Sequence, residues 1–171
     1  MKNNVLLLGG SGTLGSKIIK SKFFPNLKYP KKKILNILNK KQIENYLIKK
    51  KINLVLHCAA LARVKDCEMN KNKARKINVT GTLNIVESIL KINKIEKKDI
   101  KLVFISSDAV YASTRGNYKE IDKPFPYNFY GLTKLKGEKI VKKLKSYMII
   151  RTRFFDKSKI PFKYSAINIY T

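Results

Sequence analysis

The sequence predicts an α/β domain built around a doubly wound parallel sheet. Short runs of apolar residues alternate along the chain with stretches whose apolar residues recur at helical spacing. Strands that are apolar at every position are typical of parallel sheets, because helices cover both of their faces. Glycines follow the first apolar run directly, at the place where such folds bind ligands. The length of 171 residues favours one principal domain.

Each expected strand is a short apolar run that ends at small residues or at a polar turn. In chain order we expect strands at residues 4–8, 53–57, 101–105 and 147–151, with a weaker candidate at 34–38. Helical spacing predicts helices at residues 11–22, 42–50, 71–91 and 132–145, and a polar loop at 106–128. Pro25 should stop the first helix, because proline cannot continue one.

The chain is strongly basic, with 38 Lys+Arg against 11 Asp+Glu and a formal net charge of +27. Its 33 lysines are spread along the whole sequence, and it has only 5 of the arginines that base recognition favours. We therefore interpret the charge as a solvated surface and expect no specific nucleic-acid partner. A nucleic-acid binder driven by charge alone is an alternative, and the salt dependence of its retention on DNA would reveal it.

Two further observations bear on the compartment. No apolar run approaches the roughly 20 residues of a membrane span, so we expect no membrane contact. Two cysteines, Cys58 and Cys67, cannot form a disulfide framework. Neither cysteine combines with His57, the one histidine, in a zinc-binding spacing, so we expect packing roles and no metal. These features predict a cytoplasmic protein.

The glycines after the first strand have the spacing G-x-x-G-x-x-G. Such glycines allow a sharp turn, a close approach of backbone to a pyrophosphate, and tight packing of helix on strand. The free N–H groups of the following helix would face the phosphates. The alternative is a glycine-rich turn that binds no ligand. We expect the cofactor-binding residues of this loop to be Gly9, Ser11, Gly12, Thr13, Leu14 and Gly15.

The region after the glycine loop suggests which dinucleotide is bound. NAD-specific sites have an acidic residue about 20 positions further on, bonded to the ribose hydroxyls. Residues 16–43 contain no Asp or Glu, and they contain nine lysines. Lys31, Lys32 and Lys33 stand where the adenosine ribose is expected, and an ammonium there could hold a 2′-phosphate. NADP(H) is therefore the expected cofactor, with NAD(H) as the other option.

Tyr130 and Lys134 are four residues apart, which on a helix places them on one face. A nearby ammonium favours the phenolate, so we expect Lys134 to lower the pKa of Tyr130. Tyr130 could then donate a proton to a carbonyl oxygen as hydride reaches its carbon. Ser107 follows a strand, at the edge where its hydroxyl can bind the same oxygen. By itself, the Tyr–Lys pair would be a surface tyrosine near a solvated lysine. The glycine loop and Ser107 favour a catalytic set.

Together these motifs resemble the extended short-chain dehydrogenases/reductases. Within that superfamily, residues 116–130 are most similar to the dTDP-4-dehydrorhamnose reductase branch. The motifs that carry the resemblance are Gly9-x-x-Gly12-x-x-Gly15, Cys58-Ala59-Ala60, Asn78-Val79-x-Gly81-Thr82, Ser106-Ser107-Asp108-x-Val110-Tyr111 and Tyr130-Gly131-x-Thr133-Lys134-x-x-Gly137-Glu138.

The resemblance implies a Rossmann-like NAD(P)-binding domain at residues 1–151 and a reductase of a 4-keto nucleotide sugar, in deoxysugar or surface-polysaccharide synthesis. It implies that Tyr130 is the proton donor, Lys134 tunes its pKa and contacts the ribose, and Ser107 binds the substrate carbonyl. Ala59 and Ala60 would border the adenosine, and Tyr130 and Lys134 would also touch the cofactor.

The resemblance also assigns lesser roles and a boundary. Asn78 would support the site, and Asp108 is more consistent with a loop cap than with a base. Residues 152–171 would begin a substrate-binding region that is missing or truncated. We therefore expect this chain to bind NADPH without reducing dTDP-4-keto sugars, and its open sheet edge could allow a homodimer.

Two other functions stay open within the same superfamily. One is a nucleotide-sugar epimerase or dehydratase; a dehydratase would normally need further carboxylates beside the serine, where only Asp108 stands. The other is a non-catalytic dinucleotide-binding regulatory subunit, such as that of methionine adenosyltransferase. The presence of Ser107, Tyr130 and Lys134 together argues against the regulatory subunit.

Overall fold

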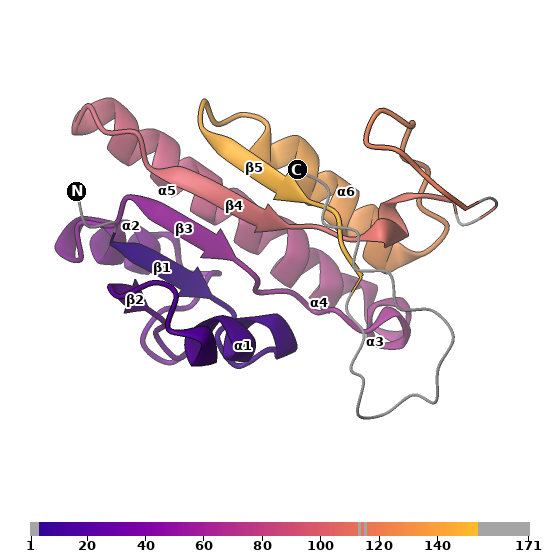
Figure 1. Ribbon diagram of the computed structural model, residues 1–171, viewed down its shortest axis with the longest axis horizontal. Coiled ribbons are helices and arrows are strands. Elements are labelled where there is room, and N and C mark those ends of the chain that lie inside the picture. The colour runs from indigo at the N-terminus through magenta and orange to yellow at the C-terminus, as the bar shows by residue number, and fades with distance from the viewer. Residues whose placement is uncertain (1–3, 113, 115, 154–171) are drawn as a thin grey trace.

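A five-stranded parallel sheet forms the centre of the protein (Figure 1). The computed structural model describes residues 4–112, 114 and 116–153. The strand order is β2-β1-β3-β4-β5, and every neighbouring pair is parallel. The strands are β1 (Val5–Leu8), β2 (Leu27–Lys28), β3 (Leu54–His57), β4 (Lys101–Ile105) and β5 (Tyr147–Ile150). The predicted α/β class with a parallel, Rossmann-like sheet is confirmed.

Helical segments connect the strands. They are α1 (Thr13–Ser21), α2 (Lys40–Lys49), α3 (Val64–Met69), α4 (Lys71–Arg75), the π-helix η1 (Lys76–Thr80), α5 (Gly81–Ile95), the 3₁₀-helix η2 (Asp108–Val110) and α6 (Phe129–Val141). Within the described ranges, none of these helices is long and apolar enough to cross a membrane.

The two faces of the sheet carry cores of different size. Because side chains alternate along a strand, Leu6 and Leu8 of β1 join one core while Val5 and Leu7 join the other. The larger core packs under α2, α5 and α6 and includes Ile43, Ile85, Ile89, Phe104 and Val141. The smaller core packs under α1, the helix drawn on the opposite side of the sheet in Figure 1.

The second strand differs from the prediction. The expected strand at residues 34–38 is a series of turns, in which the amides of Ile34 and Leu35 donate to the carbonyl of Lys31. The strand beside β1 is instead Leu27–Lys28, which is too short to carry a recognisable pattern. Leu35 still reaches the larger core, so its apolar character reflects burial within a turn.

Two helical regions also differ from the prediction. The single helix expected at residues 71–91 consists of α4, η1 and α5 in succession and continues to Ile95. The π-helical turn inserts one residue into the hydrogen-bond ladder and thereby turns Asn78 inward. Helix α6 begins at Phe129, three residues before the expected start, because Asn128 caps it. Helix α3, a short helix of six residues, was not predicted.

The strand order reverses at β1, whose neighbours are β2 on one side and β3 on the other. Parallel α/β sheets bind ligands at the carboxyl ends of the strands on either side of such a reversal. The glycine loop after β1 and the Cys58-Ala59-Ala60 segment after β3 both lie there. At the other side of the sheet, β5 pairs only with β4 among the described residues.

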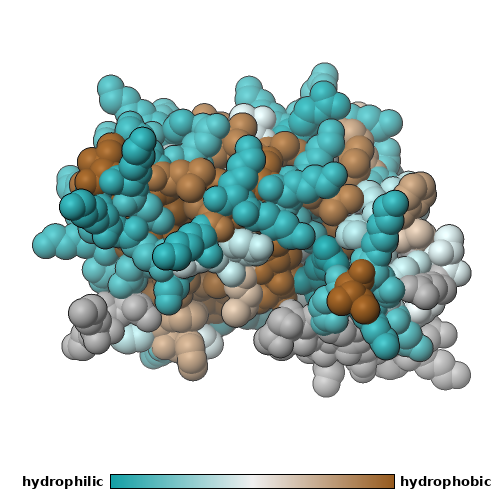
Figure 2. Space-filling model, turned by 90° about the horizontal axis from the view of Figure 1, so that it is seen from above, coloured by the Kyte–Doolittle hydropathy of each residue, from teal (hydrophilic) through white to brown (hydrophobic). Residues whose placement is uncertain are grey.

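Hydrophilic side chains cover most of the face seen in Figure 2, with hydrophobic side chains showing between them. Two carboxylates pair with lysines, Glu87 with Lys40 and Glu44 with Lys91. Most of residues 152–171, where a substrate region was expected to begin, lie outside the described residues.

Candidate functional site

The glycine loop makes a turn that only glycine fits. Gly9 has a φ of +92°, and a Cβ there would lie 2.6 Å from the backbone nitrogen of Ala59. The amide of Gly12 donates to the carbonyl of Gly9 across 3.0 Å, which closes the turn. A Cβ at Gly15 would overlap the Gly9 carbonyl oxygen, so the first turn of α1 sits directly on the loop. The free N–H groups of α1 therefore face the carboxyl end of the sheet.

A pocket of about 480 Å³ opens beside this loop. Of the residues predicted to bind a cofactor, Gly9, Ser11, Gly12, Ala59 and Ala60 line it. Thr13, Leu14 and Gly15 lie in the first turn of α1 and are not among its lining residues. Tyr130 and Lys134 of α6, which were also expected to touch the cofactor, do not line it either. The lining also includes residues that sequence reasoning did not single out: Gly10, Ile19, Tyr29, Pro30, Leu35, Asn36, Ile37, Leu38 and Ile77.

Those additional residues come mostly from the segment after β2. Their main sequence signal was the largely apolar stretch at residues 34–38, which suggested a strand instead. Lys31 and Lys32 also line the pocket, and both are exposed. The charged side chains that line the pocket are therefore both cationic, as the lack of Asp and Glu in residues 16–43 indicated.

Ser107 and Tyr130 meet at the carboxyl end of β4. Ser107 is the N-cap of η2; its hydroxyl accepts from the amide of Ala109 across 3.1 Å and is 3.0 Å from a carboxylate oxygen of Asp108. A side-chain hydrogen bond joins Ser107 to Tyr130. Burial nevertheless raises the pKa of Tyr130 to about 12, and this hydrogen bond opposes only part of the increase.

The start of α6 is held tightly against the Ser107 turn. A Cβ at Gly131 would overlap the carbonyl oxygen of Ala109, so only glycine allows this approach. Asn128 accepts from the amide of Gly131 across 2.7 Å, and Glu68 of α3 accepts from the amide of Phe129 across 2.6 Å. These contacts fix the first turn of α6, which carries Tyr130, beside the end of β4.

Lys134 is buried, with only 3% of its surface exposed. Its ammonium lies 4.0 Å from the centre of the Phe104 ring. Burial lowers the pKa of Lys134 to about 8, although the charge of Glu138 opposes this shift. The expectation that Lys134 lowers the pKa of Tyr130 is not what the structure shows. The groups that act on Tyr130 are Ser107, Cys67 and Asp108, and its pKa is raised.

Asn78 ties the two halves of the site together. Its amide oxygen accepts from the nitrogen of Leu61 across 2.7 Å, and its amide nitrogen donates to the Leu61 carbonyl and to the Thr133 hydroxyl. Leu61 follows the alanines of the pocket, and Thr133 precedes Lys134 on α6. The support expected from Asn78 is present and extends to a side chain of α6.

A buried ion pair lies behind the site. Arg151 donates to both carboxylate oxygens of Glu138, at 3.0 and 2.7 Å, and to the hydroxyl of Tyr111 at 2.6 Å. Ser106 donates to the same carboxylate at 2.5 Å. Sequence analysis quoted Glu138 and Tyr111 within motifs but did not connect them with Arg151. No local signal could have done so, because these residues come from three different elements.

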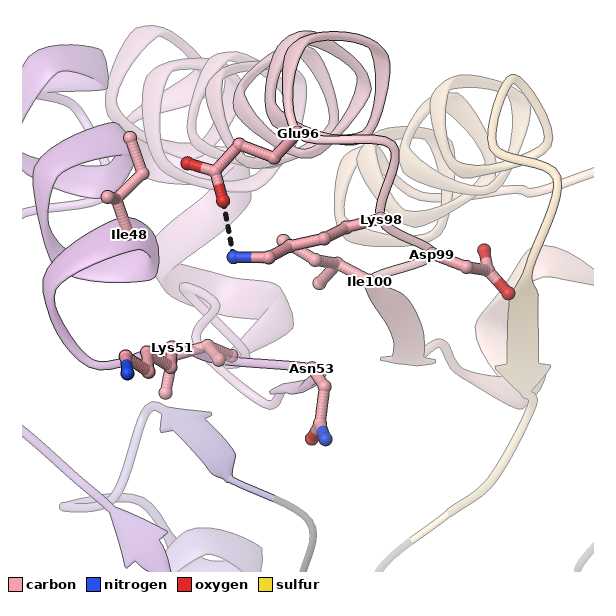
Figure 3. A pocket seen from close by; sticks show the side chains of 8 residues that line it. Ile48, Lys51, Asn53, Glu96, Lys98, Asp99 and Ile100 are labelled. Carbon is pink, nitrogen blue, oxygen red and sulfur yellow. Dashed lines mark ion pairs between the residues drawn. The ribbon is translucent and has the colours of Figure 1, made fainter. Parts of the chain in front are cut away.

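Other candidate features lie apart from this site or support it less directly. Among the described residues, no group of three or more His, Cys, Asp or Glu side chains could hold a metal ion. Asp108 faces Arg153, which agrees with a role in the loop. A second hollow of about 450 Å³ lies at the opposite end of the sheet, before β3 and β4 (Figure 3). Lys98, one of its two lysines, pairs with Glu96, and no predicted site residue lines it.

The fold and the arrangement at the carboxyl edge of the sheet define a Rossmann-like protein of the extended short-chain dehydrogenase/reductase class, in its dTDP-4-dehydrorhamnose reductase-like branch. The family described as the RmlD substrate binding domain matches residues 1–162. The chain belongs to this family.

Solved and curated relatives agree with this assignment. The dTDP-4-dehydrorhamnose reductase of Bacillus anthracis, in complex with NADP, superimposes with a TM-score of 0.80 at 32% identity, covering 89% of this chain and 53% of the relative. The reductase of Aggregatibacter actinomycetemcomitans is 27% identical, over 85% of this chain and 49% of its own length.

A relative with a different description is equally similar. Methionine adenosyltransferase 2 subunit beta of Bos taurus is 31% identical over 147 residues, which cover 80% of this chain and 42% of the relative. The chain thus spans about half the length of the proteins that it matches.

Proposed function

We propose that this chain forms the cofactor-binding part of an NADP(H)-preferring reductase that reduces the 4-keto group of a nucleotide sugar. The observation that carries the proposal is the hydrogen-bonded pair of Ser107 and Tyr130 after β4, at the same edge of the parallel sheet as the glycine-lined pocket. The likeness to NADP-bound dTDP-4-dehydrorhamnose reductase supports it.

The pocket fits a dinucleotide on three counts. The glycine loop leaves no Cβ between the backbone and a pyrophosphate, and α1 directs its free N–H groups to the same place. Ala59 and Ala60 give a flat wall of small side chains. Lys31 and Lys32 put ammonium groups within reach of a ribose phosphate. We infer that these residues hold the pyrophosphate and the adenosine end.

The chemistry supplied by a bound reduced nicotinamide is a hydride for the carbonyl carbon. Ser107 would donate a hydrogen bond to the carbonyl oxygen and orient it. Tyr130 would give its phenolic proton to that oxygen, leaving a phenolate and completing an alcohol. A pKa of about 12 keeps this proton on Tyr130 at neutral pH, which suits a donor better than a base. Lys134 would contact the ribose.

The first test is a titration with NADPH and NADH. We expect NADPH to bind more tightly by about 1 kcal/mol or more, since a hydrogen bond to a charged group is worth roughly 1.5–3 kcal/mol. The double variant Lys31→Gln/Lys32→Gln should lose this preference, whereas Lys139→Gln, an exposed lysine of α6, should keep it. Equal affinities for the two cofactors in the unmodified protein at low and moderate salt would contradict the cofactor preference.

Glycine variants test the pocket itself. A Cβ at Gly12 would lie 3.4 Å from the Gly9 carbonyl oxygen, an ordinary contact, so Gly12→Ala should fold. Its methyl group would stand where the pyrophosphate approaches, so both cofactors should bind more weakly. Gly116→Ala is the matched control, because nothing lies within 4 Å of the added Cβ.

The catalytic assignment is tested by removing the phenolic hydroxyl of Tyr130. The variant Tyr130→Phe should lower reduction of a dTDP-4-keto sugar by about 10²–10⁴-fold and leave NADPH affinity nearly unchanged.

A second candidate is a non-catalytic dinucleotide-binding subunit, which the likeness to methionine adenosyltransferase 2 subunit beta favours. Full NADPH affinity with no oxidation of NADPH by any 4-keto nucleotide sugar would support this candidate over the reductase.

A further inference from the structure

Gly81, the first residue of α5, has ordinary helical backbone angles, with φ −59° and ψ −44°. The backbone therefore does not require glycine there, and alanine would favour the helix more. The space beside the residue does require it. A Cβ at Gly81 would lie 2.7 Å from Cδ1 and 3.0 Å from Cγ1 of Ile37, well inside the roughly 3.5–4.0 Å that separates carbon atoms in contact. The Ile37 side chain thus packs directly on the start of α5.

The backbone of Ile37 is held as firmly as its side chain. The side-chain amide of Asn84, further along α5, donates to the Ile37 carbonyl across 3.0 Å. The amide of Asn36 donates to the side-chain oxygen of Gln42 on α2, also across 3.0 Å. The Asn36 side chain accepts from the amide of Leu38 across 3.1 Å. Because two helices fix this backbone, Ile37 can accommodate a larger residue at position 81 only by moving its side chain.

The other side of Ile37 faces the pocket beside the glycine loop. Its half-buried side chain packs against the larger core and also lines the pocket. Leu35, Leu38 and Ile77 line the pocket together with Ile37, so this part of the wall is apolar.

An apolar wall does not suit phosphates, which need N–H groups or ammonium groups as partners. It suits a flat ring with apolar faces, and a nicotinamide dinucleotide has two such rings. The nicotinamide has to react near Ser107 and Tyr130, which are not among the residues that line this pocket. The purine base is therefore the ring that fits beside Ile37.

We propose that Gly81 and Asn84 are positioning residues for the cofactor. Asn84 holds the backbone of Ile37 and Gly81 leaves room for its side chain, so that Ile37 forms the wall on which the purine base rests. Neither residue is among those that line the pocket, so each acts through Ile37. The inference rests on the proposed function, because only a ligand that contains a purine would use this wall.

Methyl NMR of protein labelled with ¹³C at isoleucine Cδ1 tests the wall directly. The Ile37 signal is identified by its absence in Ile37→Val, which lacks this methyl group. Addition of 2′,5′-ADP, the adenine end of NADP, should give a nuclear Overhauser effect between a purine proton and this methyl group. In the ligand-free protein, Gly81→Ala should already shift the Ile37 signal. Gly116→Ala should not, since its added Cβ meets nothing within 4 Å.

Affinity for 2′,5′-ADP tests the positioning by Gly81. The methyl group of Gly81→Ala should displace the Ile37 side chain into the pocket and weaken binding about tenfold. The double variant Gly81→Ala/Ile37→Val removes the overlapping Cδ1 as it adds a methyl group, so it should restore the affinity to within about twofold. Melting curves first establish that each variant is folded.

A further variant tests Asn84 separately. Asn84→Ala removes the hydrogen bond to the Ile37 carbonyl and should weaken binding of 2′,5′-ADP by about threefold or more. Lys94→Ala, at an exposed position of the same helix, should leave the affinity unchanged.

Three results would overturn the inference while the proposed function stands. They are binding of 2′,5′-ADP without an Overhauser effect at the Ile37 methyl group, a loss in Gly81→Ala that the double variant does not restore, and an unchanged affinity in Asn84→Ala. If the unmodified protein binds none of 2′,5′-ADP, NADPH and NADH, the proposed function itself fails. The shift of the Ile37 signal in ligand-free Gly81→Ala then still decides whether Gly81 positions that side chain.

Discussion

Burial acts on the two ionisable side chains at the start of α6 in the same sense, because it favours the neutral form of each. The pKa of Tyr130 is raised to about 12, so it keeps its proton, and that of Lys134 is lowered to about 8, so it is ready to lose one. A buried cation destabilises the fold, and a site that retains one does so for binding or chemistry.

Lys134→Met should therefore stabilise the fold and weaken NADPH binding. The variant removes a buried ammonium and keeps a side chain of similar length, so we expect a gain of about 1–3 kcal/mol at pH 7 in urea unfolding. Because the folded pKa lies below the usual 10.5 of lysine, unfolding of the unmodified protein takes up a proton between pH 8 and 10.5. The free energy of unfolding of the unmodified protein therefore rises with pH across this window, whereas that of the variant does not.

Lys136→Met is the control, since this neighbouring lysine is exposed and should change stability by no more than about 0.5 kcal/mol. A loss of stability in Lys134→Met would show that the contact with Phe104 outweighs the cost of burying the charge.

At the scale of elements, the site depends on how α6 is joined to the sheet. Gly131 lets the first turn of α6 touch the loop after β4. The Thr133 hydroxyl accepts a hydrogen bond from the side-chain amide of Asn78 in η1. Further along, Glu138 of α6 binds Arg151, just after β5, and Ser106, just after β4. This pair holds three elements at the edge where Ser107 and Tyr130 meet.

Glu138→Gln should destabilise the protein by about 3–5 kcal/mol, because it leaves the Arg151 guanidinium partly buried without a counter-charge. Urea unfolding at pH 7 measures the effect. Glu87→Gln breaks an ion pair with Lys40 in which both side chains are more than 40% exposed, and it should cost less than about 1 kcal/mol. Similar losses in the two variants would show that the buried pair contributes no more than a surface pair.

For the whole molecule, the dominant electrostatic feature is the net charge of +27. Salt has two opposing effects on such a protein: it weakens surface ion pairs, and it screens repulsion among like charges. The exposed carboxylates are too few to balance the lysines, so repulsion should dominate.

Raising sodium chloride from low concentration to about 0.3 M, where screening lengths fall well below 10 Å, should therefore raise the melting temperature by a few degrees. For a chain of this size such a shift corresponds to roughly 1 kcal/mol. Sucrose at matched osmolality controls for effects unrelated to charge. A melting temperature that falls with added salt would mean that the ion pairs outweigh the repulsion.

The sequence predicted an element well when the signal for that element was local, and poorly when the element depended on contacts with distant residues. Strands β1, β3, β4 and β5 were placed within one residue, because a continuous apolar run is a local signal of a buried strand. The two-residue β2 had no such signal, and the apolar residues after it were buried in turns instead. Helix α6 was found but began earlier than expected, since its cap at Asn128 precedes the apolar pattern.

The sequence by itself determined the parallel sheet and the glycine turn after β1, and it predicted the set of Ser107, Tyr130 and Lys134, because each depends on residue type and spacing along the chain. Only the tertiary structure decided what surrounds them. It buried Lys134 against Phe104 rather than leaving it to act on Tyr130, and it joined Glu138 to Arg151. Burial and charged neighbours shift pKa values. Both depend on segments that lie far apart in the sequence and that meet only because the sheet places them side by side.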